Sequence, residues 1–330
     1  MDKFLTIVIP TYNRKESLLR QLFSLQEIGC IDWYYLVILD NHSNYDISQE
    51  LSVAFSSEFI ENIEIRNRPF NTGIGYNIAG TFECAKTKWL WIISDDDITP
   101  PDALKIIQNY VIKYPNAAII EYSIGLDIKF DDRLIRSIQD LKKAYDDNLF
   151  MSGDLMYIGN NLYNCEVQMP YFGESCFYNY TLVPQIISSI KILSERKGLY
   201  VLSSAHVQTF VPNIHGDSWH SLKNVLAICS IYDIKWNNYS DCKLFSNMLT
   251  GHFSVDELLF TYLSGEIDMQ YRKYAYKRFL NSLFLRRMSL KERIKVKFYG
   301  IQMYTHIPIL SFFRYCNKVF FNLRVFFKFR

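Results

Sequence analysis

The sequence predicts an α/β fold with a doubly wound, mostly parallel sheet and a C-terminal helical extension that is basic and aromatic. Three observations support this prediction. Short apolar runs alternate with amphipathic stretches over the first 125 residues. Polar residues follow several of these runs directly, as they do where strands end at a ligand-binding edge. Near residue 270 the composition changes abruptly, and Lys, Arg, Phe and Tyr become frequent.

Five short apolar runs are predicted to be strands. They are Phe4–Pro10, Tyr34–Asp40, Ile63–Asn67, Lys88–Ser94 and Ala117–Ser123. Apolar residues at helical spacing predict three helices between them. These are Lys15–Ile28, Gly75–Lys86 and Asp102–Lys113, the last preceded by two prolines as a start signal. Strands that alternate with helices in this way usually pair in parallel.

Beyond residue 125 the pattern is looser. An acid-rich helical stretch is expected around Asp131–Asp147, and a segment rich in Gly, Asn and Tyr follows over Ser152–Tyr180. We divide the chain into residues 1–125, 126–270 and 271–330. No repeat or low-complexity linker separates the first two parts, so we expect the second to pack onto the first.

Charge and cysteine content narrow the function classes. The net charge of +2 hides an uneven distribution, because residues 271–330 carry 15 Lys and Arg against one acid, whereas residues 1–270 carry 21 basic and 33 acidic residues. The seven cysteines are scattered and lack a Cys-x-x-Cys pair, which disfavours a disulfide framework or a zinc site. A signal peptide and a membrane-spanning segment are not expected. These features favour a cytoplasmic protein.

The acidic motif Asp95–Asp97 is the most informative feature of the sequence. It follows the apolar run Trp89–Ile93 directly. Three adjacent carboxylates repel one another at the end of a buried strand unless positive charge neutralises them, and a hard divalent cation is suited to that role. The alternative is a solvated turn and helix cap before Pro100. Thr11, Asp40 and Asn71 are expected at the same edge of the sheet.

These strand-end residues resemble the motifs of the inverting glycosyltransferases of family 2, which have the GT-A fold. The resemblance rests on four motifs, Ile7–Arg14, Asp40–Asn44, Asn71–Gly73 with Asn77, and Ser94–Asp97. Their order after successive strands makes the joint signal specific over roughly residues 4–125. It implies that residues 1–125 form the nucleotide-sugar-binding half of a GT-A domain and residues 126–270 the acceptor-binding half.

Each nucleotide-side motif has a physical rationale. Pro10, Thr11, Tyr12 and Arg14 end a strand and open a helix, where free backbone N–H groups can hold a base or phosphate oxygen, although an ordinary helix cap is the alternative. Asp40 can accept hydrogen bonds from a base or ribose, and a plain turn residue is the alternative.

The loop after the third strand is also expected to contact the nucleotide, through Asn71, Gly73 and Asn77. Its glycine spacing, G-x-G-x4-G, differs from the dinucleotide fingerprint and disfavours a hydride-transfer cofactor. Arg66 or Arg68 could bind a phosphate, although exposed arginines are often only solvated.

The resemblance implies a Mn²⁺ or Mg²⁺ ion that bridges the two phosphates of the donor. Asp95 is expected on the ribose side and Asp96 on the metal side. Asp97 is expected to bind the metal through water or to cap the following helix.

An inverting reaction also needs a general base for the acceptor hydroxyl. In the family a Gly-Glu-Asp-like motif often supplies it. Gly173-Glu174-Ser175 is a partial match without the aspartate, so Glu174 is the first candidate. Asp217 in Gly216-Asp217-Ser218-Trp219 is the second, because the indole of Trp219 could stack on a sugar ring.

Residues 271–330 alternate cations with phenylalanines, which predicts a peripheral anchor on an anionic membrane surface. Nucleic-acid binding and a helical packing element with a solvated basic face are the alternatives, and a nucleic-acid partner is not favoured.

The whole chain is thus predicted to be a metal-dependent glycosyltransferase at the inner face of the cell membrane. It would move a sugar from a nucleoside-diphosphate sugar to a glycan, such as a lipid-linked oligosaccharide, in bacterial surface-polysaccharide synthesis. A sugar nucleotidyltransferase is a rival, but the loop after the first strand lacks the glycines that this class requires. A catalytically silent sugar- or membrane-binding protein of the same fold is the other rival.

Overall fold

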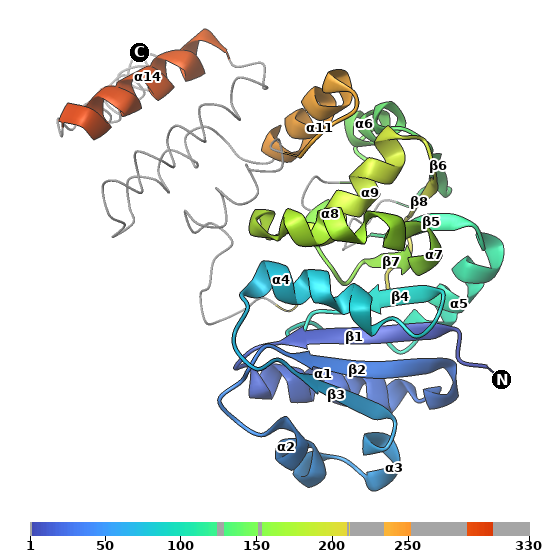
Figure 1. Cartoon of the computed structure of the whole chain (residues 1–330). Helices are drawn as coiled ribbons and strands as arrows, with labels where there is room; N and C mark the ends of the chain where they lie inside the picture. The colour runs from blue at the N-terminus through green and yellow to red at the C-terminus, as the bar shows by residue number, and fades with distance from the viewer. Residues whose placement is uncertain are drawn as a thin grey trace, which may run out of the picture.

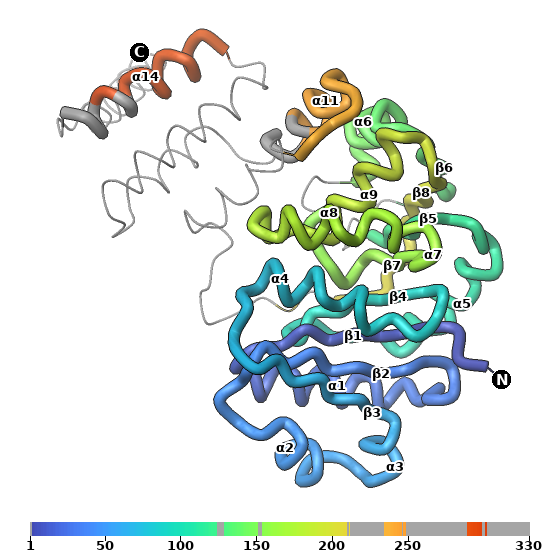
Figure 2. Tube along the Cα trace, viewed as in Figure 1, coloured from blue at the N-terminus to red at the C-terminus, as the bar shows by residue number. Residues whose placement is uncertain are grey.

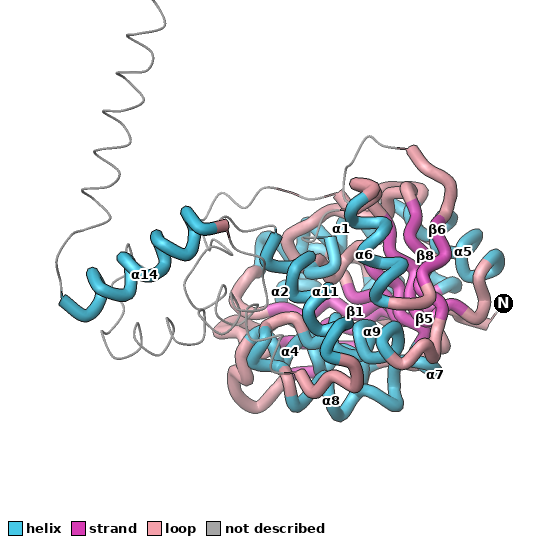
Figure 3. The backbone as a smooth tube through the Cα atoms, turned by 90° about the horizontal axis from the view of Figure 1, so that it is seen from above, coloured by secondary structure: helices cyan, strands magenta, loops and turns pink. Residues whose placement is uncertain are grey.

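An eight-stranded sheet forms the centre of the computed structural model, with strand order β3-β2-β1-β4-β7-β5-β8-β6 (Figure 1). Helices lie on both sides of the strands, which is clearest when the molecule is seen from above (Figure 3). The structure describes residues 2–123, 129–150, 154–209, 211, 234–251 and 289–305.

The first half of the sheet contains four parallel strands, as predicted. They are β3 (Ile63–Asn67), β2 (Tyr34–Asp40), β1 (Leu5–Thr11) and β4 (Trp89–Ile92). In the register, Thr11 of β1 is level with Asp40 of β2, which is level with Asn67 of β3. The carboxyl ends of these strands therefore form one continuous edge.

The second half of the sheet comes mostly from residues beyond 125. β7 (Asn161–Asn164) lies antiparallel between β4 and β5 (Ala117–Tyr122), and β8 (Leu199–Ser203) runs parallel to β5. β6 (Arg133–Ile135) pairs antiparallel with β8 at the edge. The mostly parallel α/β sheet is thus confirmed, and residues 1–125 share it with residues that follow.

Burial of both faces of the sheet explains why the strands are continuous apolar runs in the sequence. In β1, Ile7 and Ile9 pack into one core cluster, whereas Val8 packs into the cluster on the other face. A strand covered on both faces has no polar side. In helix α1, Leu18, Leu22 and Leu25 recur at helical spacing and are all buried.

Most of the helices cover the two faces of the sheet, and Figure 2 allows the order of the helices to be followed by colour. They are α1 (Lys15–Ile28), α2 (Ile47–Ala54), α3 (Ser57–Ile60), α4 (Ile74–Ala79), α5 (Ala103–Lys113), α6 (Ile138–Asp146), α7 (Cys165–Gln168), α8 (Phe172–Phe177), α9 (Pro184–Ser194), α11 (Tyr239–Gly251) and α14 (Leu290–Thr305).

Two predicted helices differ from the observed ones. The helix expected over Gly75–Lys86 ends as α4 at Ala79 and continues as a 3₁₀ segment, Gly80–Cys84, because glycine weakens an α-helix. The stretch expected to be helical around Asp131–Asp147 is helical only from Ile138. Ser137 caps α6 by accepting a hydrogen bond from the Asp140 backbone N–H at 3.1 Å, and the residues before it form β6.

The predicted membrane-associating segment 271–330 is described only over residues 289–305, which contain α14. That part confirms the helical pattern. Among the residues that the structure describes, no helix combines the length and apolar character required to cross a bilayer. The remainder of the segment lies outside the described residues.

Candidate functional site

The acidic motif lies directly after β4, at the carboxyl edge of the sheet. The side chains of Asp95 and Asp97 are almost fully buried, with residue exposures of 4% and 6%. At the end of β1, the Thr11 hydroxyl donates a hydrogen bond to Asp95 Oδ2 at 2.7 Å. The alternative of a solvated turn therefore does not describe this motif.

Arg14 forms ion pairs with two of the three carboxylates. Its Nη1 atom lies 3.2 Å from Asp95 Oδ1 and 2.6 Å from Asp96 Oδ2. Arg20 Nη2 donates to the backbone oxygen of Asp96 at 2.7 Å, and the Ser94 hydroxyl contacts the Asp96 carboxylate. These contacts hold Asp95 and Asp96 around the guanidinium of Arg14, which offsets their negative charge.

Burial strongly affects the protonation of this motif. It raises the pKa of Asp95 to about 6, although Arg14 opposes the shift. Burial also raises the pKa of Asp97 to about 7, and the neighbouring Asp96 adds to the effect. Asp97 accepts a hydrogen bond from the backbone N–H of Val211 at 3.3 Å. A cation bound here would therefore compete with protons near neutral pH.

The loop after β2 is ordered by Asp40. This carboxylate accepts hydrogen bonds from the backbone N–H of Ser43 at 3.0 Å and from its hydroxyl at 2.6 Å. The next residue, Asn41, donates from Nδ2 to Asn71 Oδ1 at 2.8 Å. Asn41 Oδ1 accepts from the Thr72 backbone N–H at 2.9 Å. The loops after β2 and β3 are thus bonded to each other.

Asn71 also fixes the turn that starts α4. Its Oδ1 atom accepts from the backbone N–H of Gly73 at 2.8 Å. Gly73 has φ = 81°, a conformation that strongly favours glycine. Two sequence-predicted site residues, Asn71 and Gly73, therefore form a single rigid turn at the edge of the sheet.

The loop after β1 is bonded to the loop after β2 in the same way. The Asn13 backbone N–H donates to Ser43 Oγ at 2.9 Å, and Asn13 Oδ1 accepts from the backbone N–H of Asn44 at 2.8 Å. Pro10 lies within β1, and Tyr12 next to Asn13 exposes its side chain to solvent. The neighbouring helix α1 begins after Arg14 without a side-chain cap, so its first N–H groups remain available to a ligand.

Tyr45 lies near both the acidic motif and the loop after β2. Burial, together with the charges of Asp40 and Asp95, raises the pKa of Tyr45 to about 12. Both carboxylates therefore lie near the same phenol. The structure thus brings together Thr11, Arg14, Asp40 and Asp95, which the sequence predicted for one site.

Asn77, by contrast, is occupied with internal contacts. Its Oδ1 atom accepts from Arg68 Nε at 2.9 Å, and its Nδ2 atom donates to the backbone oxygen of Leu39 at 3.3 Å. Arg68 also covers the ring of Tyr76, and Arg66 pairs with Glu64. In this structure the side chains of Asn77, Arg66 and Arg68 thus stabilise α4 and β3.

One of the two candidate bases, Glu174, lies among the described residues. Glu174 lies on α8 and forms an ion pair with Lys191 of α9, with Oε2 and Nζ 3.0 Å apart. α8 packs against α4, the helix that follows the Asn71 turn. Asp217 lies outside the described residues.

Sequence reasoning missed several contributors to the site. Arg20 and Ser94 contact Asp96. Ser94 belongs to the motif Ser94–Asp97 but was given no role, and no sequence signal marked Arg20. The strap of residues 204–211 carried no signal. In it Thr209 pairs with Ile98 in an isolated antiparallel bridge.

The donor set is suited to a magnesium-type ion. Within the described ranges, no cluster of three or more His, Cys, Asp and Glu side chains is arranged around one point. Asp95 and Asp96 nevertheless converge on Arg14. Mg²⁺ commonly uses one or two carboxylates together with phosphate oxygens of the substrate. Asp95 and Asp96 would supply two such carboxylates, and in this structure both are paired with Arg14.

Comparison with known proteins decides the family. Residues 6–167 match the family model described as glycosyl transferase family 2. The N-terminal half of the chain belongs to this family. The abequosyltransferase RfbV of Salmonella typhimurium is 26% identical over 107 residues, which are 32% of this chain and 32% of that protein. The match thus spans about a third of the length of this curated relative.

Solved structures extend the similarity to the fold. S. aureus TarS in complex with UDP has a TM-score of 0.57 at 13% identity, over 85% of this chain and 81% of that chain. The mannosyltransferase PcManGT from Pyrobaculum calidifontis, in complex with GDP-Man and Mn²⁺, has a TM-score of 0.53 at 11% identity, over 92% and 87%. The GT-A-like fold predicted for the family 2 domain is confirmed.

Proposed function

We propose that this protein transfers a sugar from a nucleoside-diphosphate sugar to a hydroxyl group of a glycan, with inversion at the anomeric carbon. The observation that carries this proposal is the convergence of Asp95 and Asp96 on one cationic group beside the end of β1. The family 2 domain supports it, as do the solved relatives that contain UDP or GDP-Man.

The donor would lie along the carboxyl edge of β2, β1 and β4. Asp40 and the Asn71 turn would face the nucleoside, and Arg14 with the free N–H groups of α1 would hold a phosphate oxygen. Asp96, with Asp95 or Asp97, would hold Mn²⁺ or Mg²⁺, which when bound offsets charge on the departing nucleoside diphosphate.

The acceptor hydroxyl would attack the anomeric carbon from the face opposite the nucleoside diphosphate. The new carbon–oxygen bond forms as the bond to the phosphate oxygen breaks. A carboxylate base takes the hydroxyl proton. Glu174 is the proposed base, because α8 packs against the helix that follows the Asn71 turn. Asp217 is the alternative.

We infer that the acceptor is a lipid-linked glycan of a bacterial surface polysaccharide, at the cytoplasmic face of the membrane. The name of the Salmonella relative, an abequosyltransferase, supports a sugar-transfer role. The 15 basic residues of 271–330, interspersed with phenylalanines, support attraction to anionic lipid. A nucleic-acid partner is not part of this proposal.

Donor turnover tests the proposed reaction. The purified protein is incubated with UDP-, GDP-, dTDP- and CMP-sugars and Mn²⁺, and released nucleotide is measured. We expect release from one nucleotide class, its loss in chelator, and a decrease of at least 100-fold in Asp96→Asn with an unchanged melting temperature. Glu58→Gln, a change at an exposed carboxylate on α3, is the matched control. Release that persists in chelator would exclude the metal, and no release from any donor would exclude the reaction.

A further inference from the structure

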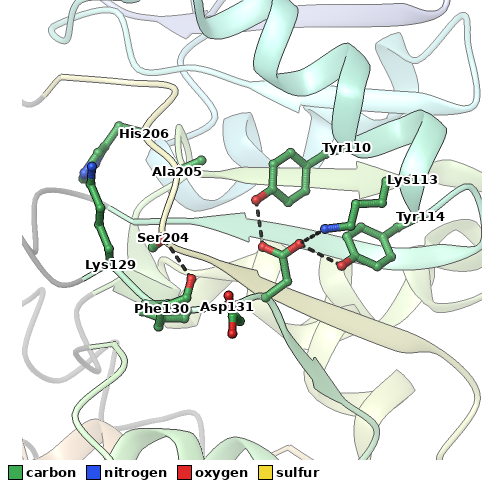
Figure 4. Close-up of a pocket in the computed structure, with 10 residues that line it drawn as sticks. Tyr110, Lys113, Tyr114, Lys129, Phe130, Asp131, Ser204, Ala205 and His206 are labelled. Carbon is green, nitrogen blue, oxygen red and sulfur yellow. Dashed lines mark hydrogen bonds and ion pairs between the residues drawn. The ribbon is translucent and has the colours of Figure 1, made fainter.

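An open cavity lies apart from the acidic motif, in the other half of the sheet. It has a volume of about 590 Å³ and lies between the last turn of α5, residues 129–132 and residues 204–206 (Figure 4). This volume is within the roughly 300–1,000 Å³ of small-molecule sites. The cavity is next to Ser203, the last residue of β8, and β8 runs parallel to β5.

One wall of the cavity is held in place by Asp132. Its Oδ1 atom accepts from the Tyr110 hydroxyl and its Oδ2 atom from the Tyr114 hydroxyl, each at 2.7 Å, and Lys113 Nζ lies 2.6 Å from Oδ2. Partial burial would raise the pKa of Asp132, but the hydrogen bonds from Lys113 and the two tyrosines lower it. This wall is therefore rigid and fully charged before any ligand arrives.

The opposite wall presents groups without a fixed partner. Neither the Lys129 ammonium nor the Asp131 carboxylate forms a hydrogen bond or ion pair with another described residue, and both side chains are exposed. Figure 4 shows Lys129 beside His206 on this wall. Among the described residues, the ring of His206 is engaged through Nδ1, 2.9 Å from the backbone oxygen of Ser123. Phe130 also lines the cavity, and its half-buried side chain packs in part against the hydrophobic core.

This combination of groups suits a sugar ring. A pyranose has an apolar face that packs on an aromatic ring, and hydroxyl groups that both donate and accept hydrogen bonds. The Phe130 ring can meet the face. The Asp131 carboxylate can accept from hydroxyl groups, and the Lys129 ammonium can donate to them. The paired charges leave little net attraction for a simple anion, because Lys113 is already neutralised by Asp132.

The strap 204–211 connects this cavity with the acidic motif. His206 lines the cavity, Thr209 pairs with Ile98, and the Val211 backbone N–H donates to Asp97. The three steps of chain from His206 to Thr209 span at most roughly 11 Å when extended, and Thr209 pairs with Ile98, the residue that follows Asp97. A ligand in the cavity is therefore separated from the acidic motif by a distance that a short oligosaccharide can cross.

We propose that this cavity is an acceptor subsite, which binds a pyranose unit of the acceptor glycan one or more sugars away from the reacting hydroxyl group. The inference rests on the proposed glycosyl transfer. It assigns acceptor recognition to Lys129, Phe130, Asp131 and His206, and it leaves donor binding to the other half of the sheet.

Ligand binding tests this subsite in the full-length protein. Saturation-transfer NMR is recorded with the methyl pyranosides of glucose, galactose, mannose, rhamnose and N-acetylglucosamine. We expect at least one to bind. Lys129→Ala and Phe130→Leu should each raise its Kd at least fivefold, whereas Lys105→Ala, which removes another exposed lysine of the same region, should not. The subsite is wrong if no pyranoside binds or if these variants bind it equally well.

Two further readouts separate the subsite from the proposed reaction. Binding of UDP and GDP with Mn²⁺ should be unchanged in Lys129→Ala and Phe130→Leu. The bound pyranoside should alter the rate of nucleotide release from the donor sugar, and this effect should disappear in Phe130→Leu. If the pyranoside binds but neither nucleotide binds nor any donor turns over, the glycosyl transfer and the acceptor role are both overturned. If nucleotide release occurs but is insensitive to the pyranoside, only the subsite is overturned.

Discussion

At the scale of single residues, Glu121 is the most unusual group outside the candidate site. It lies on β5 with 1% exposure, and neither carboxylate oxygen has a hydrogen-bond partner among the described residues. Burial raises its pKa well above the ordinary value of 4.5, and the nearby carboxylate of Asp154 raises it further. The folded protein thus holds a proton here that the unfolded chain releases at lower pH.

This proton makes stability depend on pH. Above about pH 4.5 the folded state binds more protons at Glu121 than the unfolded state, so the free energy of unfolding falls as the pH rises toward the raised pKa. Glu121→Gln removes this penalty. The melting temperature of the variant relative to wild type should therefore increase from pH 5 to pH 8 in differential scanning calorimetry. Glu58→Gln, at an exposed site, should show no such trend, and a constant difference for Glu121→Gln would contradict the prediction.

Residues of the acidic motif were predictable because they are adjacent in sequence and follow a clear apolar run. The residues that form hydrogen bonds with the acidic motif were harder to predict from the sequence. The strap residue Val211 donates to Asp97 from 114 positions away, and no local pattern marks such a contact. Asn77 was predicted to touch the nucleotide, but its side-chain hydrogen bonds are made to Arg68 and Leu39. A motif identifies the type of residue at a site more reliably than the direction of its side chain.

At the scale of elements, α8 and α9 are connected by a partly buried ion pair. Lys191 on α9 has a side-chain exposure of only 5%, and Glu174 on α8 has 43%. Removing one partner of such a pair leaves a charge poorly compensated, which costs more than the pair itself contributes. Glu174 therefore has a structural role in addition to the proposed role as the base.

A paired substitution separates the two roles. Glu174→Gln should lower both the melting temperature and kcat, while the KM for the donor changes little. Adding Lys191→Met removes the uncompensated charge, so the double variant should recover the melting temperature. If Glu174 is the base, kcat stays low in the double variant. Recovery of kcat together with stability would show that Glu174 acts only through packing, and Asp217→Asn would then be examined by the same steady-state assay.

Element prediction succeeded where periodicity was long and regular. α1, β2 and β3 have their predicted bounds because each shows a clear apolar pattern between turn signals. In the second half β5 was predicted, but β6, β7 and β8 were missed. β7 has four residues and β6 only three, too few to show alternation. Strands this short are defined by pairing with distant neighbours, which sequence alone does not reveal.

At the scale of the whole molecule, the uneven charge distribution suggests how the enzyme would meet its acceptor. Each lysine near an anionic membrane surface contributes about 1 kcal/mol to binding. Lys291 and Lys297 on α14 are both exposed. Replacing both by glutamine should weaken binding to anionic liposomes roughly 30-fold, since about 1.4 kcal/mol is tenfold. Liposome sedimentation measures this affinity.

A matched double variant controls for total charge. Lys105→Gln with Lys143→Gln also removes two exposed positive charges, but from α5 and α6. It should leave liposome binding nearly unchanged. Equal weakening by both double variants would show that net charge, and not the segment 271–330, governs membrane attraction.

The central claim is that the edge formed by β2, β1 and β4 binds a nucleoside diphosphate together with a divalent cation. Isothermal titration of the wild-type protein with UDP, GDP, dTDP and CMP, each in Mn²⁺ and in chelator, tests it most directly. We predict that one nucleotide binds in Mn²⁺ and that its Kd rises at least tenfold in chelator. Equal affinity under both conditions, or binding of none of the four, would contradict this account.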